Sequence, residues 1–282
     1  MTATHPFTRK ILLAFDFDWT LAEDSFERLV AVMGFDVGTW KSQHYQPLGK
    51  SGWDDILAKV EGLRRMCEPA GKAITVADLE EAGRTTKGFP GADTMPARLR
   101  EIARQVDASV ELEFAIVSAG YHDVFSAHPV APVFDRRHGS ALDIGDDGVV
   151  RGVKTMISHP EKVRYLQALA KGIDLGGSNA PSQTEAETPE EDMRVAFDQL
   201  IYVGDGASDL QAFGFVREKG GFAIAVSRDG EFSAKDEMLR AQRPDALAPP
   251  SYEDGAPLFE ILAHAVRSHA SRIALRRMGR DG

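Results

Sequence analysis

Short runs of apolar residues recur along the chain, and three of them are followed directly by polar residues. These runs cover residues 11–15, 112–117 and 200–203, and a further run covers 222–226. Runs of four to eight mostly apolar residues are typical of strands buried on both faces of a sheet. The pattern predicts an α/β fold with a doubly wound, Rossmann-like parallel sheet, and such sheets bind ligands at the carboxyl ends of their strands.

The segment between the first two runs has a helical pattern instead. Apolar residues recur with helical spacing at positions 26, 29, 30 and 33, and again at 53, 56, 57 and 60. Thr75 and Asp78 have the spacing of a helix-capping box. We therefore expect residues 22–89 to form a helical cap domain, inserted into an α/β core domain of residues 1–21 and 90–282.

Three later segments have patterns of their own. The turn from Gly145 to Gly148 lies between two short extended runs and predicts a hairpin within residues 134–155. The stretch from Asp174 to Asp192 is polar and acidic, which predicts a mobile loop. Helices are expected from Pro96 to Val106 and from about Pro257 onward.

Composition narrows the class of protein. The 282 residues carry a formal net charge of −10, which gives no electrostatic support for a nucleic-acid partner. Cys67 is the single cysteine, so an internal disulfide is impossible. Residues 1–10 lack the apolar core of a signal peptide, and no run approaches the length of a membrane span. We expect a cytoplasmic protein with no membrane partner.

The polar residues after the first run form the sequence Asp16-Phe-Asp18-Trp-Thr20. Two carboxylates one residue apart project from the same side of an extended chain. Such a pair suits a hard cation, a nucleophile and a proton carrier in one place. Further polar candidates then follow in order along the chain: Ser118-Ala119-Gly120, Lys162, and Gly204-Asp205-Gly206-Ala207-Ser208-Asp209.

This ordered set resembles the four motifs of the haloacid dehalogenase (HAD) superfamily of hydrolases, and most closely its phosphoserine-phosphatase-like branch. The similarity extends from about Lys10 to about Ala225. It implies a Mg²⁺-dependent phosphomonoester hydrolase that acts on a small phosphorylated metabolite through an aspartyl-phosphate. Two alternatives stay open: a phosphotransferase that uses the same intermediate, and a HAD-fold binding protein without activity.

The resemblance also implies roles for individual residues. Asp16 would be the nucleophile, and Asp18 the general acid and base. Mg²⁺ would be held by the side chains of Asp16 and Asp205 and by the backbone carbonyl of Asp18. Asp209 would hold a water or Lys162.

Phosphate binding is expected from Ser118, Ala119 and Gly120, at what we take to be a helix start with free N–H groups. Lys162 would neutralise the phosphate, and we prefer it over Lys154. Thr20 is expected near the nucleophile or phosphate, or in a structural role.

Two residues leave alternatives open. Trp19 stands where the family has a small residue, and it either narrows the site or packs inward. His122 is a candidate substrate contact. The other histidines show no zinc-ligand spacing.

The cap leaves the substrate undetermined. The family's cap glutamate falls on Ser25, and its cap arginine falls on Val60. Lys59, Arg64 and Arg65 are candidate substitutes with different geometry. Phosphoserine is therefore one candidate, and another small phosphomonoester is favoured. The sequence does not fix an oligomeric state.

Overall fold

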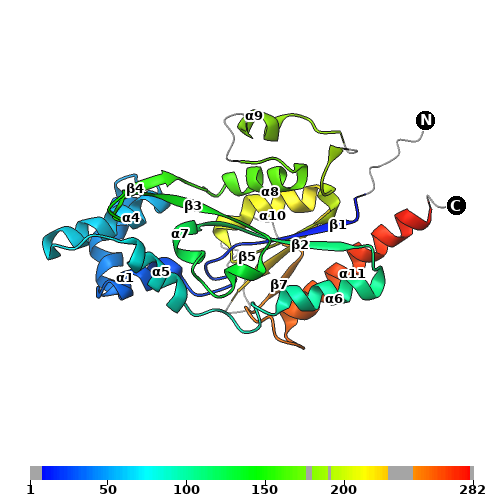
Figure 1. Cartoon of the computed structure of the whole chain (residues 1–282), viewed down its shortest axis with the longest axis horizontal. Coiled ribbons are helices and arrows are strands. Elements are labelled where there is room, and N and C mark those ends of the chain that lie inside the picture. The colour runs from blue at the N-terminus through cyan, green and yellow to red at the C-terminus, as the bar shows by residue number, and fades with distance from the viewer. Residues whose placement is uncertain (1–7, 176–179, 190–191, 228–243, 280–282) are drawn as a thin grey trace.

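The computed structural model describes residues 8–175, 180–189, 192–227 and 244–279. Within them, seven strands form one sheet in the order β4-β3-β2-β1-β5-β6-β7 (Figure 1). All neighbouring strands are parallel except β3 and β4, so the predicted parallel sheet is confirmed. The strands are Lys10–Phe15 (β1), Glu111–Tyr121 (β2), Arg136–Ile144 (β3), Val150–Thr155 (β4), Leu200–Gly204 (β5), Phe222–Val226 (β6) and Ala246–Ala248 (β7).

Side chains alternate along each strand, so both faces of the sheet carry apolar residues. Helices cover both of these faces. From β1, Ile11, Leu13 and Phe15 join the apolar cluster formed with α6 (Met95–Val106) and α11 (Pro257–Met278). Leu12 and Ala14 point to the opposite face and join the cluster formed with α8 (Glu161–Lys171) and α10 (Leu210–Glu218). Figure 1 shows the two helix pairs on opposite sides of the strands. The fold is therefore a three-layer, doubly wound α/β core.

The helices predicted near 96–106 and from Pro257 are confirmed as α6 and α11. Arg98 of α6 lies over the Phe259 ring of α11, which joins the two helices on this face. In the described ranges, no helix combines the length and the apolar character needed to cross a membrane.

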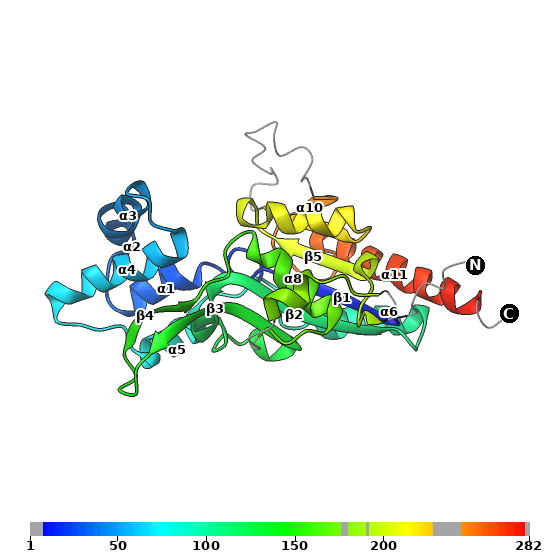
Figure 2. The same ribbon diagram turned by 90° about the horizontal axis from the view of Figure 1, so that it is seen from above.

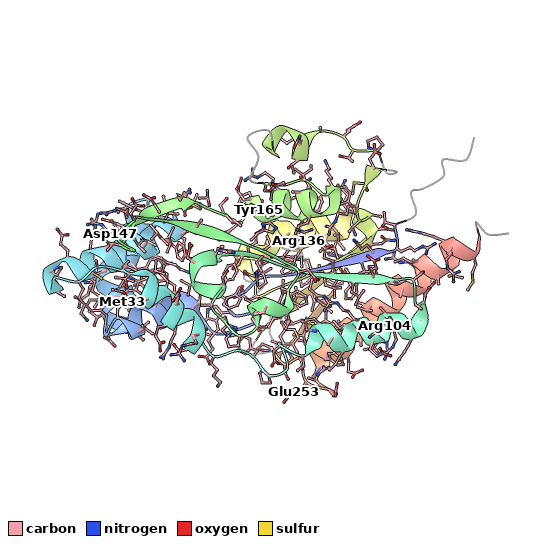
Figure 3. The ribbon with its side chains drawn as sticks, in the orientation of Figure 1. Met33, Arg104, Arg136, Asp147, Tyr165 and Glu253 are labelled. Carbon is pink, nitrogen blue, oxygen red and sulfur yellow. The ribbon has the colours of Figure 1, made fainter. Side chains whose placement is uncertain are left out.

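Residues between β1 and α6 form a separate group of helices beyond one end of the sheet (Figure 2). Thr75 caps α5 and makes the predicted capping box with Asp78. Met33 lies among the packed side chains of this group (Figure 3). The elements are α1 (Ser25–Val32), α2 (Val37–Thr39), the π-helix η1 (Trp40–Tyr45), α3 (Gln46–Lys50), α4 (Asp55–Cys67), the 3₁₀-helix η2 (Glu68–Ala70) and α5 (Val76–Thr85).

The helical group has its own apolar core, and its two connections to the sheet run side by side. The chain leaves at Ala22 and returns at Gly88, and these residues form a β-bridge. The Glu23 N–H also donates to the Lys87 carbonyl at 2.9 Å. The core of the group extends onto α7 (His122–Phe125) and the predicted hairpin, now β3 and β4, through Val124, Leu142 and Val150.

The acidic segment from Asp174 to Asp192 contains a short helix, α9 (Ala180–Glu185), so the prediction of a loop is wrong there. This polar helix is held by hydrogen bonds from Lys171, at the end of α8. Its Nζ donates to the carbonyls of Thr184 and Ala186 at 2.6 and 2.7 Å, which satisfies carbonyl groups at the end of α9. Residues 176–179 and 190–191 of this segment lie outside the described residues.

Candidate active site

The centre of the site is Asp16, the first residue after β1. Its backbone N–H donates to the Val203 carbonyl of β5 at 2.9 Å, and its Oδ1 accepts the Phe17 N–H at 2.7 Å. The residue is only 4% exposed. Burial raises the pKa of Asp16, against the opposing effect of Lys162. The carboxylate is thus fixed at the carboxyl end of the sheet, as predicted.

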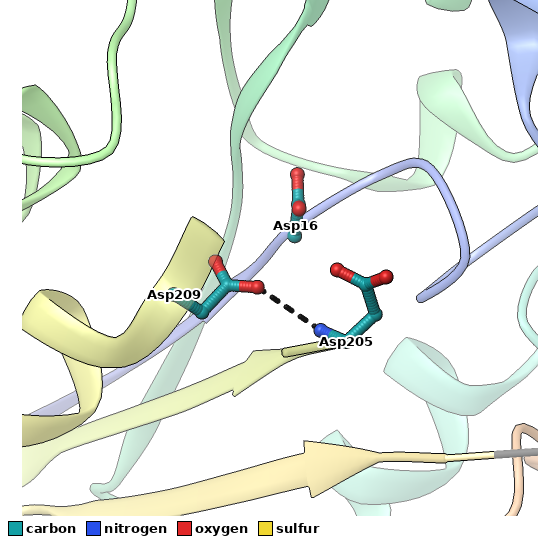
Figure 4. Close-up of side chains that lie close together, drawn as sticks. All are labelled: Asp16, Asp205 and Asp209. Atoms are coloured by element: carbon teal, nitrogen blue, oxygen red, sulfur yellow. Dashed lines mark hydrogen bonds between the residues drawn. The ribbon is translucent and has the colours of Figure 1, made fainter. Parts of the chain in front are cut away.

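Two further carboxylates reach the same place from the loop after β5. Asp16, Asp205 and Asp209 each offer an oxygen, and these oxygens lie within 4.8 Å of one another (Figure 4). Burial raises the pKa of Asp205 to about 8, with the charges of Asp209 and Asp16 adding to the effect. Such crowding of acidic oxygens out of water is unfavourable unless a cation accompanies them.

Lys162, in the first turn of α8, supplies one such cation. Its Nζ donates to Asp16 Oδ2 at 2.8 Å and to Asp209 Oδ1 at 2.6 Å, and its side chain is fully buried. Burial acts to lower the pKa of Lys162, but the two carboxylates outweigh burial and raise it. The alternative candidate, Lys154, is exposed on β4. The structure therefore brings the preferred lysine to Asp16.

Asp209 is completely buried and accepts hydrogen bonds at both carboxylate oxygens. A Cβ atom at Gly204 would lie 2.4 Å from Asp209 Cγ, so this close approach requires glycine. The donors are Lys162 Nζ and the Tyr202 hydroxyl to Oδ1, and the N–H groups of Asp205 and Gly206 and the Ser208 hydroxyl to Oδ2.

Tyr202 was not among the predicted site residues. It lies inside the apolar run 200–203, where a tyrosine is indistinguishable from core by pattern alone. Its hydroxyl nevertheless lies 2.5 Å from Asp209 Oδ1. Burial raises the pKa of Tyr202 well above its ordinary value, so the hydroxyl is neutral and donates. The available signal was its position, two residues before the Gly204-Asp205 turn at the carboxyl end of the strand.

Asp18 lies at the border between the core and the helical group. Its Oδ1 accepts the Ser25 N–H at 2.8 Å. Burial raises the pKa of Asp18 to about 7; the charge of Asp24 adds to this effect and that of Lys59 opposes it. A Cβ atom at Gly120 would lie 2.8 Å from Asp18 Oδ2, so a larger residue there would displace this carboxylate. A carboxyl group with a pKa near neutrality can both give and take a proton.

The segment from Ser118 to Gly120 differs from the prediction. We expected a helix start there, but β2 continues to Tyr121 and the four-residue α7 follows. The parallel pairing of β2 with β3 carries the strand further than its apolar run indicates. Ser118 still hydrogen-bonds to Asp16, and its hydroxyl accepts the Gly120 N–H at 3.1 Å. The three residues are thus presented by the end of a strand and not by the start of a helix.

Thr20 is fully buried and follows Asp16 and Asp18 in the same loop. Its carbonyl accepts the Tyr252 hydroxyl at 2.8 Å, which anchors the loop to the core. Its own Oγ1 has no hydrogen-bond partner among the described residues. A buried hydroxyl without a partner is costly, so this atom has a donor and acceptor available for a bound group.

Trp19 and His122 lie beside the site rather than in its centre. Trp19 has a left-handed backbone, with φ of 59°, and among the described residues it is the one non-glycine with positive φ. It lines a cavity of about 320 Å³ at the connections to the helical group. His122 packs edge-on against Phe125 and lies 3.1 Å from the Ser126 hydroxyl.

The cap residues that we considered for substrate selection lie in different places in the structure. Val60 is buried in the core of the helical group. Arg64 and Arg65 pair with Glu61 on the outer surface. Lys59 alone of the three candidate cations interacts with Asp18.

A magnesium ion fits the residues present. Asp16 and Asp205 offer oxygen ligands of the kind Mg²⁺ prefers, and their crowding calls for a cation. The Asp205 carboxylate receives no hydrogen bond from any residue that the structure describes, so its lone pairs are available. Asp209, in contrast, is occupied by protein donors.

No family model matches the sequence, and no curated protein matches it. Solved structures do match. Apo phosphoserine phosphatase is 18% identical with a TM-score of 0.57, over 90% of this chain and 98% of that one. A phospho-aspartyl intermediate analogue of phosphoserine phosphatase is 19% identical with a TM-score of 0.51, over 91% and 99%.

A HAD-family hydrolase from Salmonella enterica serovar Typhi is 19% identical with a TM-score of 0.51. The match covers 79% of this chain and 63% of that hydrolase, which is less than two thirds of its length. These three structures all have TM-scores above 0.5 against this chain. The chain therefore shares its fold with these HAD-family and phosphoserine phosphatase structures.

Proposed function

We propose that this protein is a Mg²⁺-dependent phosphomonoester hydrolase that forms a phosphorylated intermediate on Asp16. The observation that carries the proposal is the position of Asp16. It is a buried carboxylate 2.8 Å from the Lys162 ammonium, and an oxygen of Asp205 lies within 4.8 Å. The acid–base candidate Asp18 follows two residues later. A phosphoserine phosphatase of the same fold has been captured as an analogue of its phospho-aspartyl intermediate.

In the first half-reaction, a carboxylate oxygen of Asp16 attacks phosphorus, and the bond from phosphorus to the ester oxygen breaks. Asp18 gives its proton to that oxygen, so the product leaves as an alcohol. A carboxyl group whose pKa is about 7 is protonated often enough at neutral pH to do this. Lys162 balances the negative charge beside Asp16.

In the second half-reaction, water attacks the phosphorus of the aspartyl-phosphate. Asp18, now ionised, takes a proton from this water. The bond between phosphorus and the Asp16 oxygen breaks, which regenerates the carboxylate and releases inorganic phosphate. One residue thus serves as acid and then as base.

The side chains of Asp16 and Asp205 and the Asp18 carbonyl would hold the metal ion. When bound, Mg²⁺ would neutralise charge on the carboxylates and the phosphoryl oxygens. Ser118, Ala119, Gly120, Thr20 and Lys162 are the groups that we assign to phosphate binding. The unpartnered Thr20 Oγ1 supports this assignment for Thr20.

We further propose that residues 22–89 act as a cap over the site and select the substrate. Their paired connections at Ala22 and Gly88 lie next to Asp18, because Ala22 also forms a β-bridge with Asp18. With Val60 buried and Arg64 and Arg65 paired on the outer surface, no arginine of α4 interacts with Asp18. A small phosphomonoester other than phosphoserine therefore remains the favoured substrate.

The test is phosphate release from a panel of small phosphomonoesters, phosphoserine among them, with and without Mg²⁺. Release by the wild-type protein, loss of release in EDTA with recovery on adding Mg²⁺, and silence of Asp16→Asn would support the proposal. The Asp16→Asn protein must show an unchanged circular dichroism spectrum, since Lys162 keeps its bond to Asp209. Full activity in EDTA, or in Asp16→Asn, would overturn it.

A further inference from the structure

We propose that Tyr202 is a positioning residue that keeps Asp209 bound to Lys162 and outside the metal's coordination shell. This inference rests on the proposed function, because it concerns which of the three carboxylates of that site bind the metal ion and which one binds Lys162. It assigns a task to a buried tyrosine that the mechanism above does not use.

The position of Tyr202 is fixed by the sheet and by packing. It lies in the middle of β5, paired with Ala14 of β1 and Ala223 of β6. Its ring packs against Phe213 of α10 with centroids 5.7 Å apart, and the side chain is 0% exposed. The small alanines on both sides leave room for the phenol on this face. The ring therefore has one orientation, and its hydroxyl ends 2.5 Å from Asp209 Oδ1.

The lone pairs of Asp209 are fully used by protein donors. A carboxylate has about four acceptor positions. Oδ1 accepts Tyr202 and Lys162 at 2.5 and 2.6 Å. Oδ2 accepts the Asp205 N–H at 3.0 Å and the Ser208 hydroxyl at 3.2 Å, and the Gly206 N–H lies at 3.4 Å. Asp209 therefore has no free lone pair to offer a cation, although one of its oxygens lies within 4.8 Å of oxygens of Asp16 and Asp205.

Removing the Tyr202 hydroxyl would change this balance at one atom. Oδ1 would keep only the Lys162 bond and would have an open lone pair, with two other carboxylates nearby. Asp209 would then compete with them for a divalent cation. The cation would draw Asp209 away from Lys162, and Lys162 would lose one of the two contacts that hold it beside Asp16.

The test compares Tyr202→Phe with Tyr165→Phe. Tyr165, which is labelled in Figure 3, is a half-buried tyrosine of α8, one turn from Lys162. Its ring packs on His138. The control therefore loses the same hydroxyl near the same lysine without touching Asp209. Mg²⁺ affinity is measured by calorimetry on the protein without substrate, and kcat and KM are measured with p-nitrophenyl phosphate.

We expect Tyr202→Phe to bind Mg²⁺ more tightly, and to lose about 10- to 100-fold in kcat, the range that hydrogen bonds to charged groups are worth. Tyr165→Phe should match wild type in both. Unchanged Mg²⁺ affinity in Tyr202→Phe would overturn the inference even if kcat falls, and a fall in melting temperature alone would show a purely structural role. Without any wild-type turnover the proposed function fails, but the calorimetry still decides the role of Tyr202.

Should Tyr202→Phe not fold, a crystal structure of the wild-type protein with Mg²⁺ gives the same decision. We expect the Tyr202–Asp209 bond to be intact, with the Asp209 oxygens farther from the ion than the roughly 2.1 Å of a direct ligand. Direct coordination by Asp209 would overturn the inference.

Discussion

The Lys162 ammonium lies 2.8 Å from the Asp16 carboxylate, although 146 residues separate the two along the chain. Both side chains are buried, and Lys162 also binds Asp209 at 2.6 Å. The contact joins the start of α8 to the end of β1. One cation therefore balances two buried carboxylates at the carboxyl edge of the sheet, and we expect stability and the proposed chemistry to depend on the same pair.

Lys162→Met should lower the free energy of unfolding by about 3–5 kcal/mol, because removing one partner leaves buried charges without compensation. Urea denaturation at neutral pH measures this loss. Lys154→Met is the control, since Lys154 is exposed on β4 and should change stability by less than about 0.5 kcal/mol. Equal effects of the two substitutions would show that Lys162 does not compensate Asp16 and Asp209.

Asp18→Asn should slow turnover by about 10²- to 10⁴-fold, the usual contribution of general acid–base catalysis. The amide cannot give a proton to the leaving oxygen, but it keeps an oxygen that can accept the Ser25 N–H. Steady-state rates with saturating Mg²⁺ measure the loss. A rate equal to that of wild type would remove Asp18 from the mechanism.

The sequence was sufficient to predict the strands β1, β2, β5 and β6, because each is a buried apolar run. It also predicted that Asp16, Lys162 and Asp205 gather, because the motif order resembles that of a known family. Three features escaped prediction for a common reason: each depends on contacts between distant segments. Tyr202 looks like core, β2 is extended by pairing with β3, and α9 depends on Lys171.

His269 should make the protein sensitive to acid. It is buried in α11; burial lowers its pKa to about 4, and among the described residues its Nε2 has no hydrogen-bond partner. Its Nδ1 lies 2.8 Å from the Ala265 carbonyl and donates to it in the neutral ring. Above about pH 6.5 the ring is neutral in both folded and unfolded protein, so it adds no pH dependence.

As pH falls from about 6.5 to 4, only the unfolded state binds the proton, and the free energy of unfolding decreases by about 3 kcal/mol. His269→Gln should remove most of this decrease between those pH values. His264→Gln, on the exposed side of the same helix, should leave it in place. Denaturant titrations across this pH range measure the free energy of unfolding. If this free energy falls with pH equally steeply in His269→Gln and in wild type, His269 is not the group responsible.

Trp19 should carry a backbone cost, because its φ of 59° is unfavourable for any residue with a Cβ. We compare Trp19→Gly with Trp19→Ala, since both lack the indole. The glycine variant should be more stable by about 1–2 kcal/mol, measured by urea denaturation. At the exposed Trp53, whose φ is not positive, the same pair should show alanine at least as stable as glycine. An alanine variant of Trp19 as stable as the glycine variant would mean that the left-handed conformation is not kept.

The most direct test of the mechanism is to find the phosphoryl group on the protein during turnover. A phosphomonoester that the protein hydrolyses is mixed with it, the reaction is stopped with acid within one turnover, and the modified residue is located by peptide mass spectrometry. The account predicts phosphorylation at Asp16, and none in Asp16→Asn. Steady hydrolysis with Asp16 unmodified at every quench time, or phosphate found on another residue, would contradict it.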